Sequence, residues 1–338
     1  MRIHIAARFT VALGVAAMTT AASAAEKQTL HMAYWAGPSH HMVKTLEAWN
    51  KTVEAASGGN LTVEVDKASL AKPEGQYDVV KEGIRDMAWV VPGYTPGRFE
   101  LYRVAEIPFI CSNATACSTA LWNWYAKHKL AEKEFTDTRL LIAFTTGPFA
   151  LHTTRPVKTL YEVRGLKVRV AGAAVPIAKA LGMTAVAMPA TEAYQTLQRG
   201  TVDGTVFPWE AIDSFRLQEV VKAHLEFPGG LLTASFFLNI NPKAWQKLTP
   251  DNQAALAKAA DSAGSLFLGK AWDAADAPGR ENAQKRGNLI QTIASDEFAR
   301  WKPLLQAVRE EWLKNAKERG VDGPALLADF EAMVKAGG

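Results

Sequence analysis

Two stretches of this chain follow the same order of residues: YDVVKEGIRDMAWVVP at 77–92 and YQTLQRGTVDGTVFP at 194–208. In both, a glycine follows the tyrosine by six positions, and an aspartate follows the glycine by three. The order predicts a helix, a glycine C-cap, a short turn and a strand that a proline ends. Each strand would end at the carboxyl edge of its sheet, where open α/β sheets bind ligands. The repetition therefore indicates two lobes whose strand ends face one cleft.

Alternating strands and helices are expected on both sides of these stretches. The residue periodicity predicts strands at Gln28–Tyr34, Leu61–Val65, Val168–Val170 and Val202–Phe207, and helices at His40–Ala56, Ile177–Leu181 and Glu192–Gln198. This alternation predicts an α/β fold with largely parallel sheets. From Pro250 onward the pattern is mostly helical, with helices expected over 252–272 and 298–319. A helically spaced set that we expect to face the core comprises Trp301, Leu305, Val308 and Trp312.

The first 25 residues have the three parts of a secretory signal peptide. Arg2 and Arg8 give a positive start, Phe9–Met18 is a short apolar run, and small residues suit cleavage after Ala24 or Ala25. The alternative is a membrane-spanning helix, which needs about 20 apolar residues, and threonines and a serine interrupt this run too early. The segment therefore predicts that the mature protein is exported.

Composition and charge exclude several classes of protein. The 338 residues are 48% hydrophobic and 21% charged, which is typical of a globular chain with one large or two ordinary domains. The net charge is +4; without Arg2 and Arg8 it falls to +2, since 36 Lys and Arg then face 34 Asp and Glu. No strong basic field remains to attract nucleic acid or an anionic membrane surface.

The sequence contains two cysteines, Cys111 and Cys117. Two are too few for a scaffold of several disulfides or for a four-cysteine zinc site. In an oxidising compartment, cysteines this close are expected to form a disulfide; the alternative is two separate thiols. Their spacing differs from the Cys-x-x-Cys of a thioredoxin-type redox pair.

Several short motifs, taken together and in order, resemble those of a known family. They are Ser57–Asn60 before a strand, Gly83–Ala88, Ile107-Pro108-Phe109, Gly165–Val170 with the sequence GLKVRV, and Glu192–Gly204 with the sequence EAYQTLQRGTVDG. With the signal peptide, they resemble the DctP-type solute-binding proteins of TRAP transporters over nearly the whole mature chain.

The resemblance implies a two-lobed periplasmic protein that captures an organic acid and delivers it to the small and large TRAP membrane subunits, which an ion gradient drives. It implies a first lobe over 26–146, to which part of 230–338 returns, a second lobe over 147–229, to which part of 250–338 returns, and a helix over 250–272 that spans both. It implies no cofactor and no metal, and a monomer is the simplest expectation for such a carrier.

Arg169, in the GLKVRV motif, is the residue that the resemblance assigns to ligand binding. In the family, this arginine binds the carboxylate of the ligand in the cleft. The chemistry is appropriate, because a planar guanidinium donates two parallel hydrogen bonds to a carboxylate. Pro176 suits the first turn of a following helix, whose amino end adds positive potential. The alternative is a surface arginine in a structural ion pair.

The chain departs from the family pattern at two aligned positions. Many members that bind sugar acids or dicarboxylates have a second arginine where Phe149 stands, and an asparagine where Phe207 stands. One carboxylate anchor with aromatic walls suits an aromatic or hydrophobic monocarboxylate. A sugar acid, a 2-oxo acid or a C4-dicarboxylate remains the alternative substrate, and the structural alternative is that both phenylalanines are core residues.

Other residues lie where the pockets of the family gather side chains, and each has a structural alternative. Aromatic residues at strand ends or in cleft loops could line the pocket or lie in the core. A histidine that begins a helix could bind the ligand or lie exposed, and a glutamate before a helix could supply a polar contact. This set comprises Trp35, Trp89, Tyr94, Trp209, Phe236, His40 and Glu74. We interpret Asp203 as structural, because it follows the glycine C-cap in the turn.

Two other functions compete with this interpretation. Ser69 and Lys72 match the Ser-x-x-Lys motif of penicillin-binding enzymes, but the companion motifs Ser-Asp-Asn and Lys-Thr-Gly are absent from the sequence. The seven histidines do not have metal-ligand spacing, and no nucleotide-binding loop is present. A secreted enzyme is therefore disfavoured. A ligand-sensing or scavenging protein would have the same fold and is not distinguished by the mature sequence.

Overall fold

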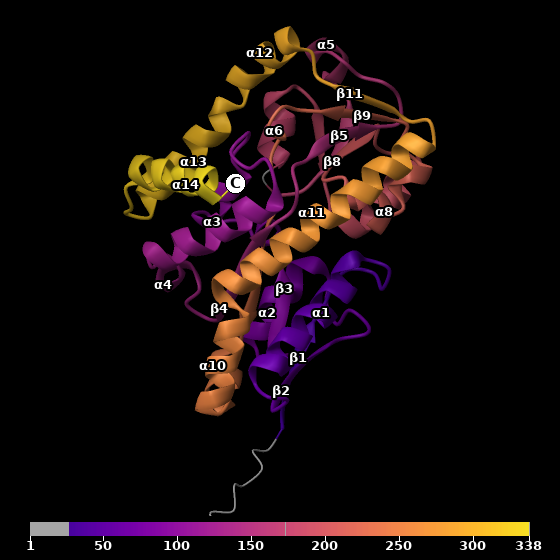
Figure 1. Ribbon diagram of the computed structural model, residues 1–338. Coiled ribbons are helices and arrows are strands. Elements are labelled where there is room, and N and C mark those ends of the chain that lie inside the picture. The colour runs from indigo at the N-terminus through magenta and orange to yellow at the C-terminus, as the bar shows by residue number, and fades with distance from the viewer. Residues whose placement is uncertain (1–26, 173, 338) are drawn as a thin grey trace, which may run out of the picture.

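Two mixed β-sheets, each covered by helices, form the two lobes of the protein (Figure 1). The computed structural model describes residues 27–172 and 174–337. The first lobe is built on the sheet β2-β1-β3-β10-β4, and the second lobe on the sheet β11-β9-β5-β8-β6-β7. The predicted two-lobed α/β fold is confirmed. The predicted signal peptide lies outside the described residues.

The elements have the following bounds. The first sheet contains β1 (Gln28–Ala33), β2 (Leu61–Val65), β3 (Met87–Val90), β4 (Arg139–Thr145) and β10 (Ser235–Ile240); the second contains β5 (Ala150–Thr153), β6 (Lys167–Val170), β7 (Thr184–Ala187), β8 (Gly204–Phe207), β9 (Ala223–Glu226) and β11 (Leu289–Thr292). The helices up to the last strand of the first sheet are α1 (His41–Ala56), α2 (Gln76–Lys81), α3 (Ala114–Lys127), α4 (Ala131–Glu134), α5 (Leu160–Val163), α6 (Ala174–Ala180), α7 (Ala193–Gln198) and α8 (Glu210–Ser214). The later helices are α9 (Pro242–Lys247), α10 (Pro250–Ala259), α11 (Asp261–Lys285), α12 (Ser295–Leu304), α13 (Gln306–Glu318) and α14 (Gly323–Gly337). Short 3₁₀ turns are η1 (Pro73–Gly75), η2 (Pro92–Tyr94), η3 (Tyr102–Glu106), η4 (Ala190–Glu192) and η5 (Leu217–Glu219).

The two repeated stretches form equivalent units, α2–β3 in the first lobe and α7–β8 in the second. Gly83 and Gly200 end the helices with positive φ of 73° and 66°, which glycine adopts at low cost. Asp86 accepts a hydrogen bond from the His31 N–H, and Asp203 accepts one from the Lys167 N–H. Each aspartate therefore fastens the turn to a neighbouring strand, and β3 and β8 both lie in the interior of their sheets.

The sheets are mixed, so the expectation of largely parallel sheets was wrong. Strand β10 runs antiparallel to β3 and β4, and β5 runs antiparallel to β8 and β9. These strands follow two extended segments that cross between the lobes side by side. The Thr146 N–H donates to the Ala234 carbonyl, and the Phe149 N–H donates to the Leu232 carbonyl. A direct crossing without an intervening helix delivers the chain antiparallel to its neighbours.

The long helix that spans the lobes is α11, which packs on α3 and β4 of the first lobe and on α8 of the second (Figure 1). Residues 250–272 were expected to form one helix, but the chain breaks at Ala260 (φ −92°, ψ −134°), so that α10 and α11 are separate. Helix α11 then continues to Lys285, well beyond the expected end.

The C-terminal helices also connect the lobes. The expected helix over 298–319 is divided at Leu305 into α12 and α13, two residues after Pro303. Trp301 and Val308 are buried in the core of the second lobe, whereas Trp312 is buried in the core of the first, beside α3 and α14. The predicted apolar set is therefore buried throughout, but it faces two cores. Strand β11, before α12, was not expected.

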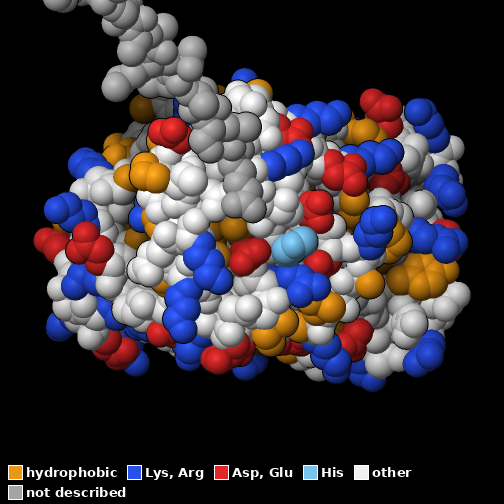
Figure 2. All heavy atoms as spheres, turned by 90° about the horizontal axis from the view of Figure 1, so that it is seen from below, with side chains coloured by type: hydrophobic (Ala, Val, Ile, Leu, Met, Phe, Trp, Pro, Cys, Tyr) orange, Lys and Arg blue, Asp and Glu red, His pale blue; other side chains and the backbone are white. Residues whose placement is uncertain are grey.

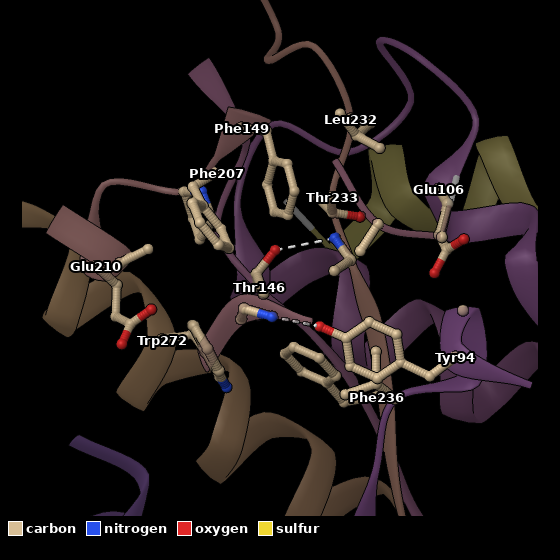
Figure 3. A pocket seen from close by; sticks show the side chains of 18 of the residues that line it. Tyr94, Glu106, Thr146, Phe149, Phe207, Glu210, Leu232, Thr233, Phe236 and Trp272 are labelled. Atoms are coloured by element: carbon tan, nitrogen blue, oxygen red, sulfur yellow. Dashed lines mark hydrogen bonds between the residues drawn. The ribbon is translucent and has the colours of Figure 1, made fainter. Parts of the chain in front are cut away.

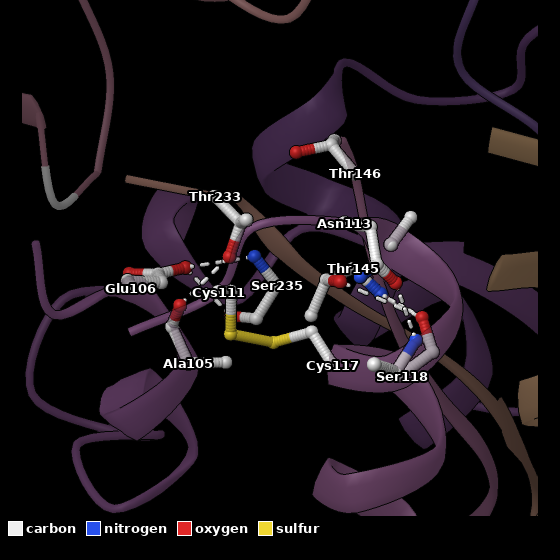
Figure 4. The surroundings of a disulfide bond; sticks show 12 residues. Ala105, Glu106, Cys111, Asn113, Cys117, Ser118, Thr145, Thr146, Thr233 and Ser235 are labelled. Carbon is white, nitrogen blue, oxygen red and sulfur yellow. Dashed lines mark hydrogen bonds between the residues drawn. A yellow bond between two sulfur atoms is a disulfide. The ribbon is translucent and has the colours of Figure 1, made fainter. Parts of the chain in front are cut away.

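The predicted disulfide joins Cys111 to Cys117, with Cα atoms 5.6 Å apart (Figure 4). It ties the loop after η3 to the first turn of α3. Beside it, Thr233 donates to the Ala105 carbonyl, and Glu106 accepts hydrogen bonds from the N–H and the hydroxyl of Ser235. The disulfide thus holds the chain next to η3 in place, and η3 in turn binds the crossing segment that leads into β10.

The surface shows no single-signed field on the face in Figure 2, where Lys and Arg side chains alternate with Asp and Glu and apolar side chains form small groups. This agrees with the low net charge. Within residues 27–172 and 174–337, no helix combines the length and the apolar character needed to cross a membrane.

Candidate ligand-binding site

A cavity with an empty volume of about 640 Å³ lies between the lobes (Figure 3). Its walls come from strand ends and loops of both lobes and from α11. The lining includes Trp35, His40, Trp89, Tyr94, Glu106, Thr146, Phe149, Arg169, Phe207, Glu210, Phe215, Leu232, Thr233, Phe236 and Trp272.

Arg169 on β6 is a buried cation that forms no ion pair in the described part of the chain, although the charge of Glu192 acts on it from farther away. Its side chain is 2% exposed, and no carboxylate of the described residues lies within 4.0 Å. The Nε and Nη2 groups donate to the Met188 carbonyl at 3.1 and 2.8 Å, and the guanidinium lies 4.3 Å from the centroid of the Phe207 ring. Burial lowers the pKa of Arg169, yet arginine stays protonated. A buried charge of this kind requires an anion.

Tyr94, from the first lobe, lies beside Arg169 in the cavity. Its hydroxyl oxygen accepts the Ala190 N–H at 3.0 Å and lies 3.5 Å from Arg169 Nη2. Because both neighbours are donors, the hydroxyl proton is available for an anion. The Tyr94–Ala190 bond also joins the two lobes across the cavity (Figure 3).

Phe149 and Phe207 form an aromatic wall in the second lobe. Phe149 comes directly before β5, Phe207 is the last residue of the paired strand β8, and their ring centroids are 6.3 Å apart. Phe207 also stacks on Phe215 at 5.8 Å. The two positions at which the sequence departs from its family therefore both line the cavity, as the specificity argument requires.

The wall from the first lobe and α11 is also aromatic. Trp35 and Trp89 lie 4.5 Å apart, Trp89 and Phe236 lie 5.3 Å apart, and Phe236 and Trp272 lie 5.3 Å apart. These rings lie on both sides of the cavity floor and give it an apolar surface suited to a planar ring.

A second polar cluster comprises Glu210, His40 and His41. The Glu210 Oε1 atom lies 3.4 Å from His40 Nε2 and 3.5 Å from His41 Nε2. Burial, followed by the nearby Asp276 and Asp213, raises the pKa of Glu210 to about 8. Burial lowers the pKa of His40 well below its usual value and that of His41 to about 4. All three groups are therefore neutral near pH 7.

The spacing of this cluster resembles a metal site, but the tautomer of His40 does not fit one. His40 caps α1, and its Nδ1 accepts the Met42 N–H at 3.2 Å. A backbone N–H can only donate, so the proton of the neutral imidazole lies on Nε2, the atom that faces Glu210. A metal ligand needs a free lone pair at that nitrogen. His40 is therefore a hydrogen-bond donor to the cavity.

Eight of the ten residues that the sequence proposed for the ligand line this cavity. Trp209 does not: it packs on His152 and His224, and its indole N–H donates to Glu226. The reason is that β8 ends at Phe207 and the chain turns into α8, which directs the next side chains to other faces. Glu74 lines a separate outer cleft rather than the cavity.

The sequence missed several lining residues. Glu210 follows the second repeated stretch directly, so its place at a strand end was a usable signal. Trp272 gave no signal, because it comes from the middle of α11. Thr146 and Thr233 come from the crossing segments, where Thr146 accepts the Ala234 N–H and Thr233 donates to the first lobe.

Two glycines, one from each lobe, approach each other closely beside the cavity. A Cβ atom on Gly93 of the first lobe would lie 2.8 Å from the Cα atom of Gly172 of the second. Both residues, with Tyr94 and Ala171, line the cavity and also the outer cleft, which has an empty volume of about 1,370 Å³. The backbones of the two lobes are therefore in direct contact between the cavity and the outer cleft.

Comparison with known families gives a direct match. Residues 32–315 match the DctP model, described as bacterial extracellular solute-binding protein, family 7. The chain belongs to this family.

Three solved structures of DctP-type proteins are similar to this chain, and all three are TRAP solute-binding proteins. One from Bordetella bronchiseptica, with bound (R)- and (S)-mandelate, is 33% identical with a TM-score of 0.88, over 91% of this chain and 99% of the other. One from Rhodoferax ferrireducens, with copurified benzoate, is 32% identical with a TM-score of 0.86, over 92% and 98%. A marine metagenome protein described as specific for aromatic acids, with 3-hydroxybenzoate, is 29% identical with a TM-score of 0.86, over 92% and 99%.

Proposed function

We propose that this DctP-type protein captures an aromatic monocarboxylate in the periplasm and delivers it to the membrane subunits of a TRAP transporter. The observation that carries the proposal is the buried Arg169, which forms no ion pair in the described part of the chain, in a cavity with aromatic walls. The ligand carboxylate would supply the missing negative charge and accept hydrogen bonds from the guanidinium and from Tyr94.

The lining favours one carboxylate over two. Among the described residues that line the cavity, Arg169 is the only lysine or arginine. The carboxylate of Glu106 is already held by Ser235 and Arg103, and Glu210 is an acid. A second ligand carboxylate would therefore meet no cation. A sugar acid would bury hydroxyls against Phe149 and Phe207, at about 1–3 kcal/mol for each unpaired group.

The relatives support the same class of ligand. Proteins about 30% identical to this chain over nine-tenths of its length hold mandelate, benzoate and 3-hydroxybenzoate. Each of these ligands has one carboxylate and one aromatic ring, which is the shape that the cavity accommodates. Family membership supports a periplasmic location after removal of residues 1–25.

The test is calorimetry on refolded, ligand-free mature protein with benzoate, mandelate, a sugar acid, pyruvate and succinate. Aromatic monocarboxylates should bind at micromolar or lower concentration, and the others at least tenfold more weakly. Tight binding of succinate or the sugar acid in preference to the aromatic acids would reject the substrate class. Recovery of the ligand unchanged after incubation distinguishes a carrier from an enzyme, which would convert it.

A further inference from the structure

The end of the cavity away from Arg169 has a polar pair for which the bound carboxylate provides no partner. Glu210, the first residue of α8, comes from the second lobe, and His40, the N-cap of α1, comes from the first. Both side chains are 2% exposed, and both line the cavity. Because each lobe provides one member of the pair, the pair lies in the part of the cavity that both lobes enclose.

Glu210 has an unsatisfied hydrogen-bonding atom. Its Oε1 is buried and forms no aligned hydrogen bond in the described part of the chain, although His40 Nε2 lies 3.4 Å away and His41 Nε2, also buried and without a partner there, lies 3.5 Å away. His40 presents an N–H at that nitrogen, because its Nδ1 is occupied by the Met42 N–H. The pair thus offers one donor and one carboxyl oxygen. Buried polar atoms in native proteins are rarely left without a partner.

A hydroxyl group matches this pair. It has one proton to donate and two lone pairs to accept with, so a single oxygen can accept from His40 and donate to Glu210. A methyl group would leave both atoms unpaired. Because burial raises the pKa of Glu210 to about 8, the pair is neutral near pH 7, and it favours a neutral substituent over an ammonium group.

The polar pair is separated from the carboxylate anchor by aromatic rings. Arg169 lies over Phe207, Phe207 stacks on Phe215, and Phe215 lies 5.3 Å from His40. No ion pair within 4.0 Å joins Arg169 to Glu210 in the described residues. A ligand ring against this wall would therefore have its carboxylate at one end and a ring substituent at the other.

We propose that Glu210 and His40 bind a hydroxyl substituent on the ligand ring, so that the preferred ligand is a hydroxylated aromatic monocarboxylate. This inference rests on the proposed function, because it assumes that Arg169 holds the carboxylate. It adds a specificity determinant at the opposite end of the cavity.

The experiment compares benzoate with its three monohydroxy isomers by calorimetry near pH 7. At least one isomer should bind wild-type protein about tenfold more tightly than benzoate. In Glu210→Met and in His40→Phe, the ratio of hydroxybenzoate affinity to benzoate affinity should fall to near one. Glu281→Gln is the control, because Glu281 is an exposed carboxylate outside the cavity, and this variant should keep the wild-type ratio.

The outcomes separate the two proposals. If benzoate and all three isomers bind wild-type protein equally, the hydroxyl site is rejected while the aromatic carrier stands; this arm needs no variant and so does not depend on folding. If Glu210→Met keeps the wild-type preference, the hydroxyl is bound elsewhere and the assignment to Glu210 is overturned. If none of the four acids binds but a sugar acid or a dicarboxylate does, the proposed function fails, and this inference fails with it.

Discussion

The two ends of the cavity differ in their charge. At one end, Arg169 is buried, always charged and held in place by the Met188 carbonyl. At the other, Glu210 and His40 are equally buried but neutral near pH 7, since burial opposes the charged form of each. A single fixed cation selects an anion, whereas a neutral pair selects a hydrogen-bonding group without adding charge. The asymmetry explains how one pocket can prefer a monocarboxylate to a dicarboxylate.

The largest effect should come from removing the charged end. Arg169→Ala should weaken binding of an aromatic acid by about 2–5 kcal/mol, or roughly thirtyfold to several thousandfold, because the ligand carboxylate loses its buried partner. Arg169→Lys should recover part of the loss, since it keeps the charge but not the planar fork. Calorimetry measures both, and Arg199→Ala, on an exposed position of the same lobe, is the control. Wild-type affinity in Arg169→Ala would contradict the assignment.

A smaller effect is expected from the wall between the two ends. Phe207→Asn removes the ring that lies 4.3 Å below the guanidinium and stacks on Phe215. Benzoate affinity should fall about tenfold, as expected for loss of an aromatic contact and its buried area. A sugar acid should gain affinity, because the amide can pair with a hydroxyl. A competition assay with both ligands measures the change, and an unaltered preference would show that Phe207 does not set specificity.

Closure of the lobes brings the two ends together, and it depends on Gly93. Gly93→Ala places a methyl group 2.8 Å from the Gly172 backbone, so the closed arrangement should become less populated. Apparent affinity should then fall, by about tenfold if closure is reduced to a tenth. Solution scattering should show less compaction on ligand addition. Gly37→Ala, with no atom within 4 Å of the added methyl, should behave as wild type.

The last effect concerns the neutral end of the cavity and appears in stability rather than in affinity. Glu210 has its pKa raised from 4.5 to about 8 in the folded protein, so the folded state keeps a proton that the unfolded state has lost. The contribution of Glu210 to the free energy of unfolding is therefore most favourable below pH 4.5. It declines as the pH rises from there to about 8, by at most about 1.4 kcal/mol per pH unit. The nearby Asp276, with a pKa raised to about 7, acts in the same direction.

Glu210→Gln should remove this decline for one group. The melting temperature of the variant relative to that of wild type should increase as the pH rises from about 5 to 8. Thermal unfolding of ligand-free protein measures this difference. Glu106→Gln, which alters another buried carboxyl, tests whether any acid in the cavity gives the same result. A constant difference between wild type and Glu210→Gln over this range would show that Glu210 is ionised throughout.

Local patterns predicted the elements that depend on nearby residues. The repeated stretches, helix α1 and strand β2 follow from glycine caps, apolar periodicity and turn residues, which act over a few positions. The direction of β5 and β10 could not be predicted in this way, because it depends on the pairing of two distant crossing segments. The break at Ala260 is similar, since the residues on either side are ordinary helix formers.

The sequence by itself determined the two-lobed α/β fold, and the resemblance at GLKVRV singled out Arg169 as the anchor. Only the tertiary structure decided that Trp209 faces away from the ligand, that Trp272 completes the aromatic wall, and that His40 meets Glu210. The physical reason is the same in each case. Strand and helix patterns depend on short-range spacing, whereas the neighbours of a side chain, its burial and hence its pKa depend on segments that only folding brings together.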